Sequence, residues 1–177
     1  MKKALILHAW YSKPNDNWYP WLKKQLEGKG YEVYIPDLPT MGTNLPDLKK
    51  QLDFVEKNFK IDNDTIIFGH SLGTLLTMRL AEKYMFRKMF LVAGWDFNDL
   101  TSEHRLFWKT QMNHQKIKAH VKEIYVFSSD NDPYITAIQA EDMSKRLAGK
   151  FILIKGACHF SEKLGGVKTF NQLLKYI

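Results

Sequence analysis

Cysteine is nearly absent from this sequence: Cys158 is the single one among 177 residues. One cysteine cannot form a disulfide within the chain, which excludes a disulfide-held fold and favours a reducing compartment. Long apolar runs are also missing, and none approaches the ~20 residues that a membrane-spanning helix needs. The apolar run near the start, Ala4–Leu7, is too brief for the hydrophobic region of a secretory signal. We therefore expect a soluble, cytoplasmic protein without a membrane partner.

Acidic residues are outnumbered, with 19 Asp and Glu against 26 Lys and Arg, which gives a formal net charge of +7 and a pI of about 9.3. Such a balance is typical of proteins that bind nucleic acids or anionic surfaces. The lysines, however, occur in pairs such as Lys23 with Lys24, and never in a block of five or six like charges. Solvated helix faces explain this pattern. We expect no nucleic-acid partner, and the sequence indicates no protein partner.

The apolar content is that of a folded domain, with 45% hydrophobic and 14% aromatic residues. At this length a domain buries roughly 70% of the surface that its unfolded chain exposes, so it needs no metal or disulfide for stability. No internal repeat, low-complexity tract or linker interrupts the chain. We expect residues 1–177 to form a single domain.

Six short runs of β-branched or aliphatic residues predict buried strands: Ala4–Leu7, Tyr31–Ile35, Thr65–Phe68, Met89–Val92, Ile124–Phe127 and Phe151–Ile154. Between them, apolar residues at three- and four-residue spacing predict helices over Trp18–Glu27, Leu45–Phe59, Leu72–Tyr84 and Thr136–Leu147. This alternation favours a mostly parallel six-stranded sheet with helices on both faces, a three-layer α/β/α sandwich. Residues 95–120 are the least regular part, and we expect either a crossover helix or a small lid.

One motif joins a predicted strand directly to a predicted helix. The segment Gly69-His70-Ser71-Leu72-Gly73 has the pattern G-x-S-x-G, with an apolar strand before it and an apolar helix after it. In this context the serine occupies a sharp, strained turn, and the glycines leave room where a Cβ would collide with neighbouring elements. The alternative is a serine that simply caps the helix. The motif favours Ser71 as a nucleophile.

A serine nucleophile needs a base, and the base needs a group that fixes its tautomer. In this architecture both follow later strands, in the order Ser, Asp or Glu, His. His159 follows the last predicted strand and is our candidate base. The loop after the fifth strand offers Asp130 and Asp132. We prefer Asp132, because Pro133 stiffens the backbone beside it, whereas Asp130 has the more turn-like position.

Two backbone N–H groups are candidates for stabilising an oxyanion beside the serine. The N–H of Leu72 begins the helix after Ser71, and the loop after the first strand offers that of Trp10 or, less favourably, Ala9. We expect His8 to hydrogen-bond locally and shape this loop, and His70 to point away from the serine. The remaining histidines, His104, His114 and His120, fall in the helical crossover region.

These motifs together resemble the α/β-hydrolases, and more narrowly the small serine hydrolases typified by retinoblastoma-binding protein 9 and its bacterial relatives. The resemblance spans nearly the whole chain and is carried by Leu7-His8, Asn17–Leu22, Gly69–Gly73, Asp132-Pro133 and His159-Phe160. It implies a triad of Ser71, Asp132 and His159. Relatives usually carry Gly where this chain has Ala9 and Cys158. We expect Cys158 to be a small buried side chain beside His159 and no nucleophile, because it lacks a strand-to-helix turn.

The residues and the resemblance predict a serine hydrolase that cleaves small carboxylic esters through an acyl-enzyme, without cofactor or metal. Aromatic side chains are candidates for the walls of an acyl pocket: Trp10, Tyr11, Trp95, Phe97 and Trp108. One alternative is a hydrolase-like protein with weak or no turnover that acts as a binding or regulatory module. Another is a flavodoxin-like nucleotide or flavin binder, but the segment His8–Tyr11 is too bulky for a phosphate-binding loop.

Overall fold

A single parallel sheet organises the protein, and the computed structural model describes residues 2–177. Its strands are β1 (Lys3–Leu7), β2 (Glu32–Tyr34), β3 (Thr65–His70), β4 (Phe86–Val92), β5 (Val121–Ser129) and β6 (Lys150–Ile154). They lie in the order β2-β1-β3-β4-β5-β6, and every neighbouring pair is parallel. The order in which strands are added to the sheet therefore reverses between β1 and β3. Open parallel sheets bind ligands at the carboxyl ends of the strands beside such a switch point.

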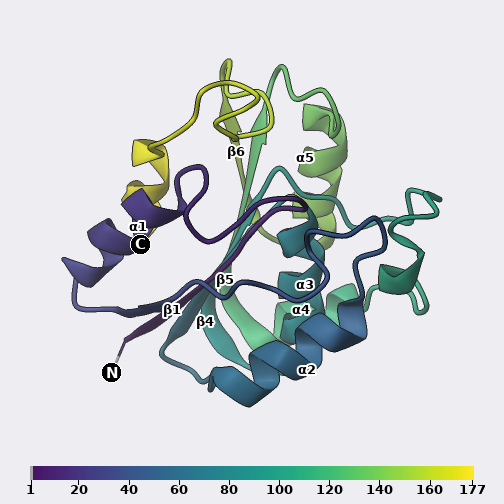
Figure 1. Ribbon diagram of the computed structural model, residues 1–177, viewed down its shortest axis with the longest axis horizontal. Coiled ribbons are helices and arrows are strands. Elements are labelled where there is room, and N and C mark those ends of the chain that lie inside the picture. The colour runs from purple at the N-terminus through teal and green to yellow at the C-terminus, as the bar shows by residue number, and fades with distance from the viewer. Residues whose placement is uncertain (1) are drawn as a thin grey trace.

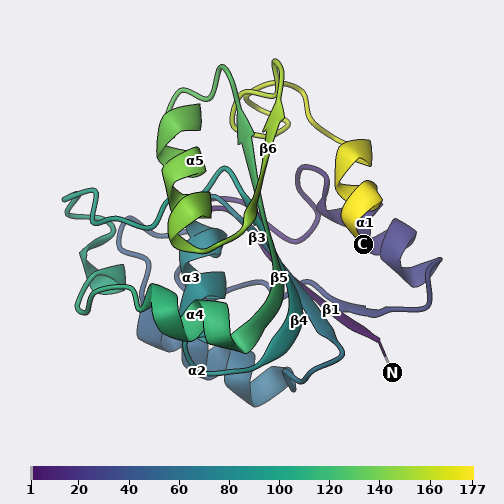
Figure 2. The same cartoon turned by 180° about the vertical axis from the view of Figure 1, so that it is seen from behind.

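Helices cover both faces of the sheet, which confirms the three-layer architecture (Figure 1). They are α1 (Tyr19–Glu27), α2 (Leu48–Asn58), α3 (Leu72–Ala81), α4 (His114–His120) and α5 (Ala137–Arg146), with 3-10 turns at Arg105–Phe107 and Asn171–Tyr176. Helices α2 to α5 pack on one face, and α1 packs on the other with the C-terminal 3-10 turn, as the reverse view also shows (Figure 2). Within residues 2–177, no helix has the length and apolar character to cross a bilayer.

The sequence alternation of each strand explains the two cores. Leu5 and Leu7 of β1 pack on the α3 side, whereas Ala4 and Ile6 pack on the α1 side, because successive side chains of a strand point to opposite faces. Helix α3 is buried along its whole length, since α2 and α4 flank it and the sheet lies beneath it. The helix that follows Ser71 is thus the most firmly enclosed of the fold.

Several predicted boundaries shift in the structure. Strands β4 and β5 each begin three residues before the predicted runs. In the added part of β4, the charged Lys88 is buried, and its ammonium group donates to the carbonyl of Tyr176. Helix α2 begins at Leu48 because the Asp47 side chain caps it by accepting the N–H of Lys50. Residues 95–120 contain a 3-10 turn and α4, so they do not form a single crossover helix.

Candidate active site

Ser71 stands on a sharp turn between β3 and α3. Its backbone has a φ of 52° and a ψ of −122°, a strained conformation for a residue with a side chain. The N–H of Ser71 donates to the carbonyl of Val92 on β4, and the hydroxyl of Thr74 donates to the carbonyl of Ser71. These bonds hold the turn, so the hydroxyl of Ser71 is left free to face the carboxyl edge of the sheet.

The two glycines of the motif allow α3 to lie close against the sheet. A Cβ at Gly73 would lie 2.3 Å from the carbonyl oxygen of Leu7, and one at Gly69 would lie 2.5 Å from the hydroxyl of Thr77. Both distances are well inside van der Waals contact, so no larger residue fits without moving backbone. The close approach also brings Ser71 beside the end of β1.

His159 lies on a loop without regular structure that side chains from elsewhere hold in place. Three side chains accept backbone N–H groups of this loop: Asp130 from Gly156, Ser129 from Ala157 and Asn131 from Cys158. Two more side chains contact its carbonyl oxygens, His70 that of His159 and Trp18 that of Phe160. Cys158 and Phe160 both have positive φ, of 46° and 53°. The loop therefore depends on these bonds for its conformation, because such backbone angles are disfavoured in isolation.

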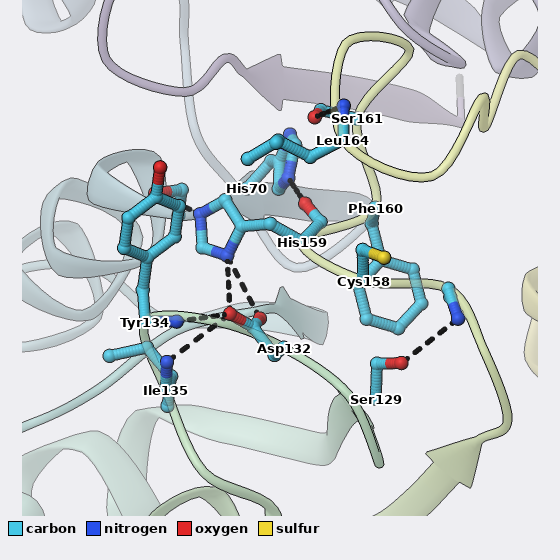
Figure 3. A network of polar contacts seen from close by, with 12 residues as sticks. His70, Ser129, Asp132, Tyr134, Ile135, Cys158, His159, Phe160, Ser161 and Leu164 are labelled. Carbon is cyan, nitrogen blue, oxygen red and sulfur yellow. Dashed lines mark hydrogen bonds and ion pairs between the residues drawn. The ribbon is translucent and has the colours of Figure 1, made fainter.

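Asp132 is the carboxylate that reaches the histidine. Its Oδ2 lies 2.8 Å from Nδ1 of His159, and its Oδ1 accepts the N–H groups of Tyr134 and Ile135 (Figure 3). The side chain is only 1% exposed, so these partners replace water around the charge. Asp130 instead accepts the N–H of Gly156 and stabilises the loop.

The three side chains meet at the carboxyl ends of β3, β5 and β6. Nε2 of His159 lies 2.8 Å from Oγ of Ser71, on the opposite side of the ring from Asp132. A carboxylate accepts, so Nδ1 of the imidazole carries the proton, and in the neutral ring Nε2 accepts from the serine hydroxyl. This arrangement can withdraw a proton from Ser71 and stabilise the resulting imidazolium.

The loop after β1 is expected to supply one of the two oxyanion N–H groups, from Trp10 or Ala9. The N–H of Ala9 donates to the hydroxyl of Tyr19, at 3.0 Å, so it is not available to a ligand. The N–H groups of Trp10 and Leu72 donate no hydrogen bond to any part of residues 2–177, and both residues line the cleft described below. Of the two alternatives in this loop, the geometry favours Trp10.

The other histidines of the site are structural, as expected. Nδ1 of His8 donates to the carbonyl of Ala9, and Nε2 accepts the N–H of Leu38, which ties the loop after β1 to the segment after β2. Burial lowers the pKa of His8, consistent with a neutral ring. His70 points away from Ser71 and into the core between α1 and the loop of His159.

A cleft of about 1250 Å³ opens over the serine. Ser71 and His159 line it, together with four of the aromatic residues considered above for an acyl pocket: Trp10, Tyr11, Trp95 and Phe97. Trp108 does not line it. That residue borders a smaller pocket of about 410 Å³ and lies near the guanidinium of Arg79. The expectation that Trp108 contributes to the wall was therefore wrong.

Hydrogen bonds from α3 and α5 hold residues 97–113 in place. The buried guanidinium of Arg79, on α3, donates to the carbonyls of Phe107, Thr110 and Gln111. The carboxylate of Asp96 binds Arg146 through two hydrogen bonds and also contacts His114. These bonds fix both ends of the segment against α3 and α5.

Two further residues of the cleft, His104 and Tyr134, were not among the predicted site residues. His104 lines it with Nδ1 2.6 Å from the carboxylate of Asp99, between the rings of Trp10 and Trp95. Tyr134 stands edge-on against the imidazole of His159, with ring centroids 4.8 Å apart (Figure 3). No motif in the sequence marks His104 and Asp99, although they lie only five residues apart, and the contact with Trp10 crosses the fold. The proximity of Tyr134 to Asp132 was a usable signal.

Cys158 differs from its expected state. It is half-buried rather than buried, and its Sγ accepts a weak hydrogen bond from the side-chain amide of Asn131. The φ of this residue is positive, and the imidazole of the next residue, His159, reaches the serine hydroxyl. Among residues 2–177, no group of three or more His, Cys, Asp or Glu side chains is arranged to hold a metal ion.

The parallel sheet, the strand-to-helix turn at Ser71 and the position of His159 after the last strand define the α/β-hydrolase class. The structural comparison agrees. The ydeN gene product of Bacillus subtilis superposes with a TM-score of 0.85 at 23% identity, covering 99% of this chain and 96% of that one. Est1E of Butyrivibrio proteoclasticus superposes with a TM-score of 0.70 at 16% identity, covering 99% of this chain and 89% of that one.

A family model described as serine hydrolase matches residues 4–176, so the chain belongs to the serine hydrolase family. It is 28% identical to the serine hydrolase RBBP9 of Rattus norvegicus over 167 residues, which cover 90% of this chain and 84% of the relative. It is 26% identical to the YdeN protein of Bacillus subtilis over 171 residues, covering 93% and 88%. These relatives confirm the resemblance that the motifs indicated.

Proposed function

We propose that the protein hydrolyses small carboxylic esters through an acyl-enzyme on Ser71, with His159 as the base and Asp132 as its orienting partner. The observation that carries this proposal is the continuous contact from Asp132 through the imidazole to the serine hydroxyl, 2.8 Å on each side of the ring. Membership of the serine hydrolase family supports the general reaction. The choice of ester, the acyl-enzyme and the residue roles are our proposal.

In the first half of the reaction, Oγ of Ser71 forms a bond to the ester carbonyl carbon and its proton passes to Nε2 of His159. The carbonyl oxygen becomes an oxyanion, which the N–H groups of Leu72 and Trp10 stabilise. As the bond to the leaving alcohol breaks, the alkoxide takes the proton from His159. The products are a free alcohol and an acyl-serine.

In the second half, a water molecule enters where the alcohol left. His159 withdraws a proton from the water, whose oxygen bonds to the acyl carbon. The bond to Oγ then breaks, and the serine takes the proton back from His159. The carboxylic acid leaves and the enzyme is restored, so the cycle consumes only ester and water and requires no cofactor.

The cleft indicates which esters to test. Aromatic side chains line part of it, including Trp10, Trp95 and Phe97, and such side chains favour flat or apolar acyl groups. The structural neighbour Est1E was solved with ferulic acid bound, so hydroxycinnamate esters are included among the candidates.

The proposal is tested with a panel of p-nitrophenyl esters of graded acyl length, methyl ferulate, and matching thioesters and amides. The wild type should hydrolyse esters, and a fluorophosphonate probe should label it covalently. Ser71→Ala should lose both reactions. A folded wild type that the probe does not label and that hydrolyses no ester would establish the alternative, a binding module on a hydrolase scaffold.

A further inference from the structure

A buried hydrogen-bond chain connects the loop after β1 to the loop of His159, and the catalytic cycle above does not use it. The N–H of Ala9 lies 3.0 Å from the hydroxyl of Tyr19, which lies 2.6 Å from Nδ1 of His70. Nε2 of His70 lies 2.8 Å from the carbonyl oxygen of His159. Tyr19 and His70 are both fully buried, so water cannot replace any of these partners.

The direction of every bond in this chain follows from the groups present. The N–H of Ala9 and the amide of Asn17 both donate to the hydroxyl oxygen of Tyr19, so the single hydroxyl proton of Tyr19 goes to Nδ1 of His70. Nδ1 is then an acceptor, and the proton of the imidazole is on Nε2. A carbonyl oxygen can only accept, so Nε2–H donates to His159.

The chain works in one protonation state of His70. Burial, together with the neighbouring His159, lowers the pKa of His70 to about 3, so the ring is neutral at physiological pH. Burial also raises the pKa of Tyr19 above its ordinary value, so that its hydroxyl stays protonated and able to donate. A protonated His70 would present N–H to Tyr19 as well, and the hydroxyl could then no longer donate to His70.

Both ends of this hydrogen-bond chain carry groups that the proposed reaction uses. Ala9 precedes Trp10, whose N–H is the proposed oxyanion donor. The carbonyl of His159 belongs to the base itself, in a loop whose neighbours Cys158 and Phe160 have positive φ. A second residue of the same helix end, Trp18, donates its indole N–H to the carbonyl of Phe160 at 3.0 Å. The start of α1 and His70, the last residue of β3, thus support both loops.

We infer that Tyr19 and His70 are positioning residues. They hold the Trp10 N–H and the His159 imidazole at the distances and angles from Ser71 that the reaction needs. The inference rests on the proposed function. Neither residue touches the reacting atoms. Their effect acts through the two backbone segments, and it should therefore appear in transition-state stabilisation more than in substrate binding.

The first test compares Tyr19→Phe with Tyr125→Phe. The second variant also removes a tyrosine hydroxyl from a hydrogen bond, to Glu123, but on β5 away from the carboxyl edge of the sheet. We expect Tyr19→Phe to lower kcat for p-nitrophenyl butyrate by about 10- to 100-fold, with KM changed less than about threefold. Its affinity for phenylboronic acid, which forms a tetrahedral adduct on Ser71, should fall by the same factor. Tyr125→Phe should change neither quantity.

The second test uses rescue at position 70. His70→Leu has no polar atom, whereas His70→Gln keeps an N–H that can reach the carbonyl of His159. We expect His70→Leu to lower kcat at least as much as Tyr19→Phe does. The kcat of His70→Gln should be about tenfold higher than that of His70→Leu. Equal kcat in both variants, or a wild-type kcat in folded Tyr19→Phe, would overturn the inference.

An NMR measurement on the wild type needs no variant to fold. Long-range ¹H–¹⁵N spectra should show His70 as the Nε2–H tautomer, neutral from pH 8 to pH 5. A ring protonated on Nδ1, or one that titrates near pH 6.5, would contradict the assigned bonds. The two proposals also fail separately, since a wild type without hydrolysis refutes the proposed function, whereas an active wild type with an unaffected Tyr19→Phe refutes only this inference.

Discussion

Gly73→Ala tests whether the site depends on the close contact between α3 and the end of β1. Helix propensity alone predicts a gain, because alanine in a helix interior is about 0.5–1 kcal/mol more favourable than glycine. The contact predicts the opposite. The new Cβ would lie 2.3 Å from the carbonyl oxygen of Leu7 and 2.8 Å from that of His8, and both are backbone atoms of a buried strand end.

The expected size follows from this overlap. To reach ordinary contact, α3 must move away from β1 by about 1 Å, and overpacking of this kind costs about 1–3 kcal/mol of unfolding free energy. For a domain of this length, that lowers Tm by roughly 3–10 °C. The same movement carries Ser71 and Leu72 away from Trp10, and a misplacement of about 1 Å lowers kcat by about 10²-fold.

Urea unfolding followed by tryptophan fluorescence measures the stability, and initial rates with a p-nitrophenyl ester measure kcat. Gly28→Ala is the matched control, because a Cβ there makes only ordinary contacts, at 3.5 and 3.6 Å, and its φ is −62°. That variant should be unchanged or more stable by up to about 1 kcal/mol, with wild-type kcat. A Gly73→Ala protein that is as stable and as active as Gly28→Ala would refute the steric argument.

Three further predictions concern the triad, the buried histidine and the cysteine. Asp132→Asn should lower kcat by about 10⁴-fold, because the amide favours the wrong imidazole tautomer, whereas Asp130→Asn still accepts the Gly156 N–H and should keep kcat within about twofold. Since the pKa of His70 is about 3 when folded and about 6.5 when unfolded, the unfolded state binds more protons between these pH values. The wild type should therefore lose about 2 kcal/mol of stability from this group between pH 8 and pH 5, a loss that His70→Gln should not share. Cys158→Ala should keep kcat within about twofold, because its thiol accepts one weak hydrogen bond.

Steady-state rates at pH 8 test the first and third of these predictions, and full activity in Asp132→Asn would show that another group orients the base. Urea titrations at pH 5 and pH 8 test the second. If the wild type and His70→Gln show the same pH dependence of the unfolding free energy, then His70 is not held neutral by burial. Inactivation by Cys158→Ala would reopen the thiol as a participant in the reaction.

The sequence predicts the sheet well, although the edge strands β2 and β6 are only partly buried, because the central strands β1, β3, β4 and β5 are largely buried. Such strands read as continuous apolar runs, and each of the six was found where a run occurs. The starts of β4 and β5 were missed because charged residues interrupt the pattern there. Lys88 is buried all the same, paired with the carbonyl of Tyr176 and near Glu123, and local sequence gives no sign of either partner.

The sequence predicts which side chains converge where each follows a strand, but it does not predict hydrogen bonds that cross the fold. Ser71, Asp132 and His159 each follow a strand of a recognisable order, so their convergence could be anticipated from topology. The role of His70 could not, because its partners come from α1 and from the loop after β6. The anchoring of residues 97–113 by Arg79 is of the same kind, since an arginine within an apolar helix does not indicate which carbonyls it meets.

The central claim is that Ser71 carries the acyl group during turnover. Wild-type protein mixed with p-nitrophenyl butyrate, quenched in acid within milliseconds and digested, should yield a peptide containing Ser71 that is heavier by one butyryl group. His159→Ala should yield none of it. Rapid ester hydrolysis with the butyryl group on another residue, or on no residue at all, would contradict the account.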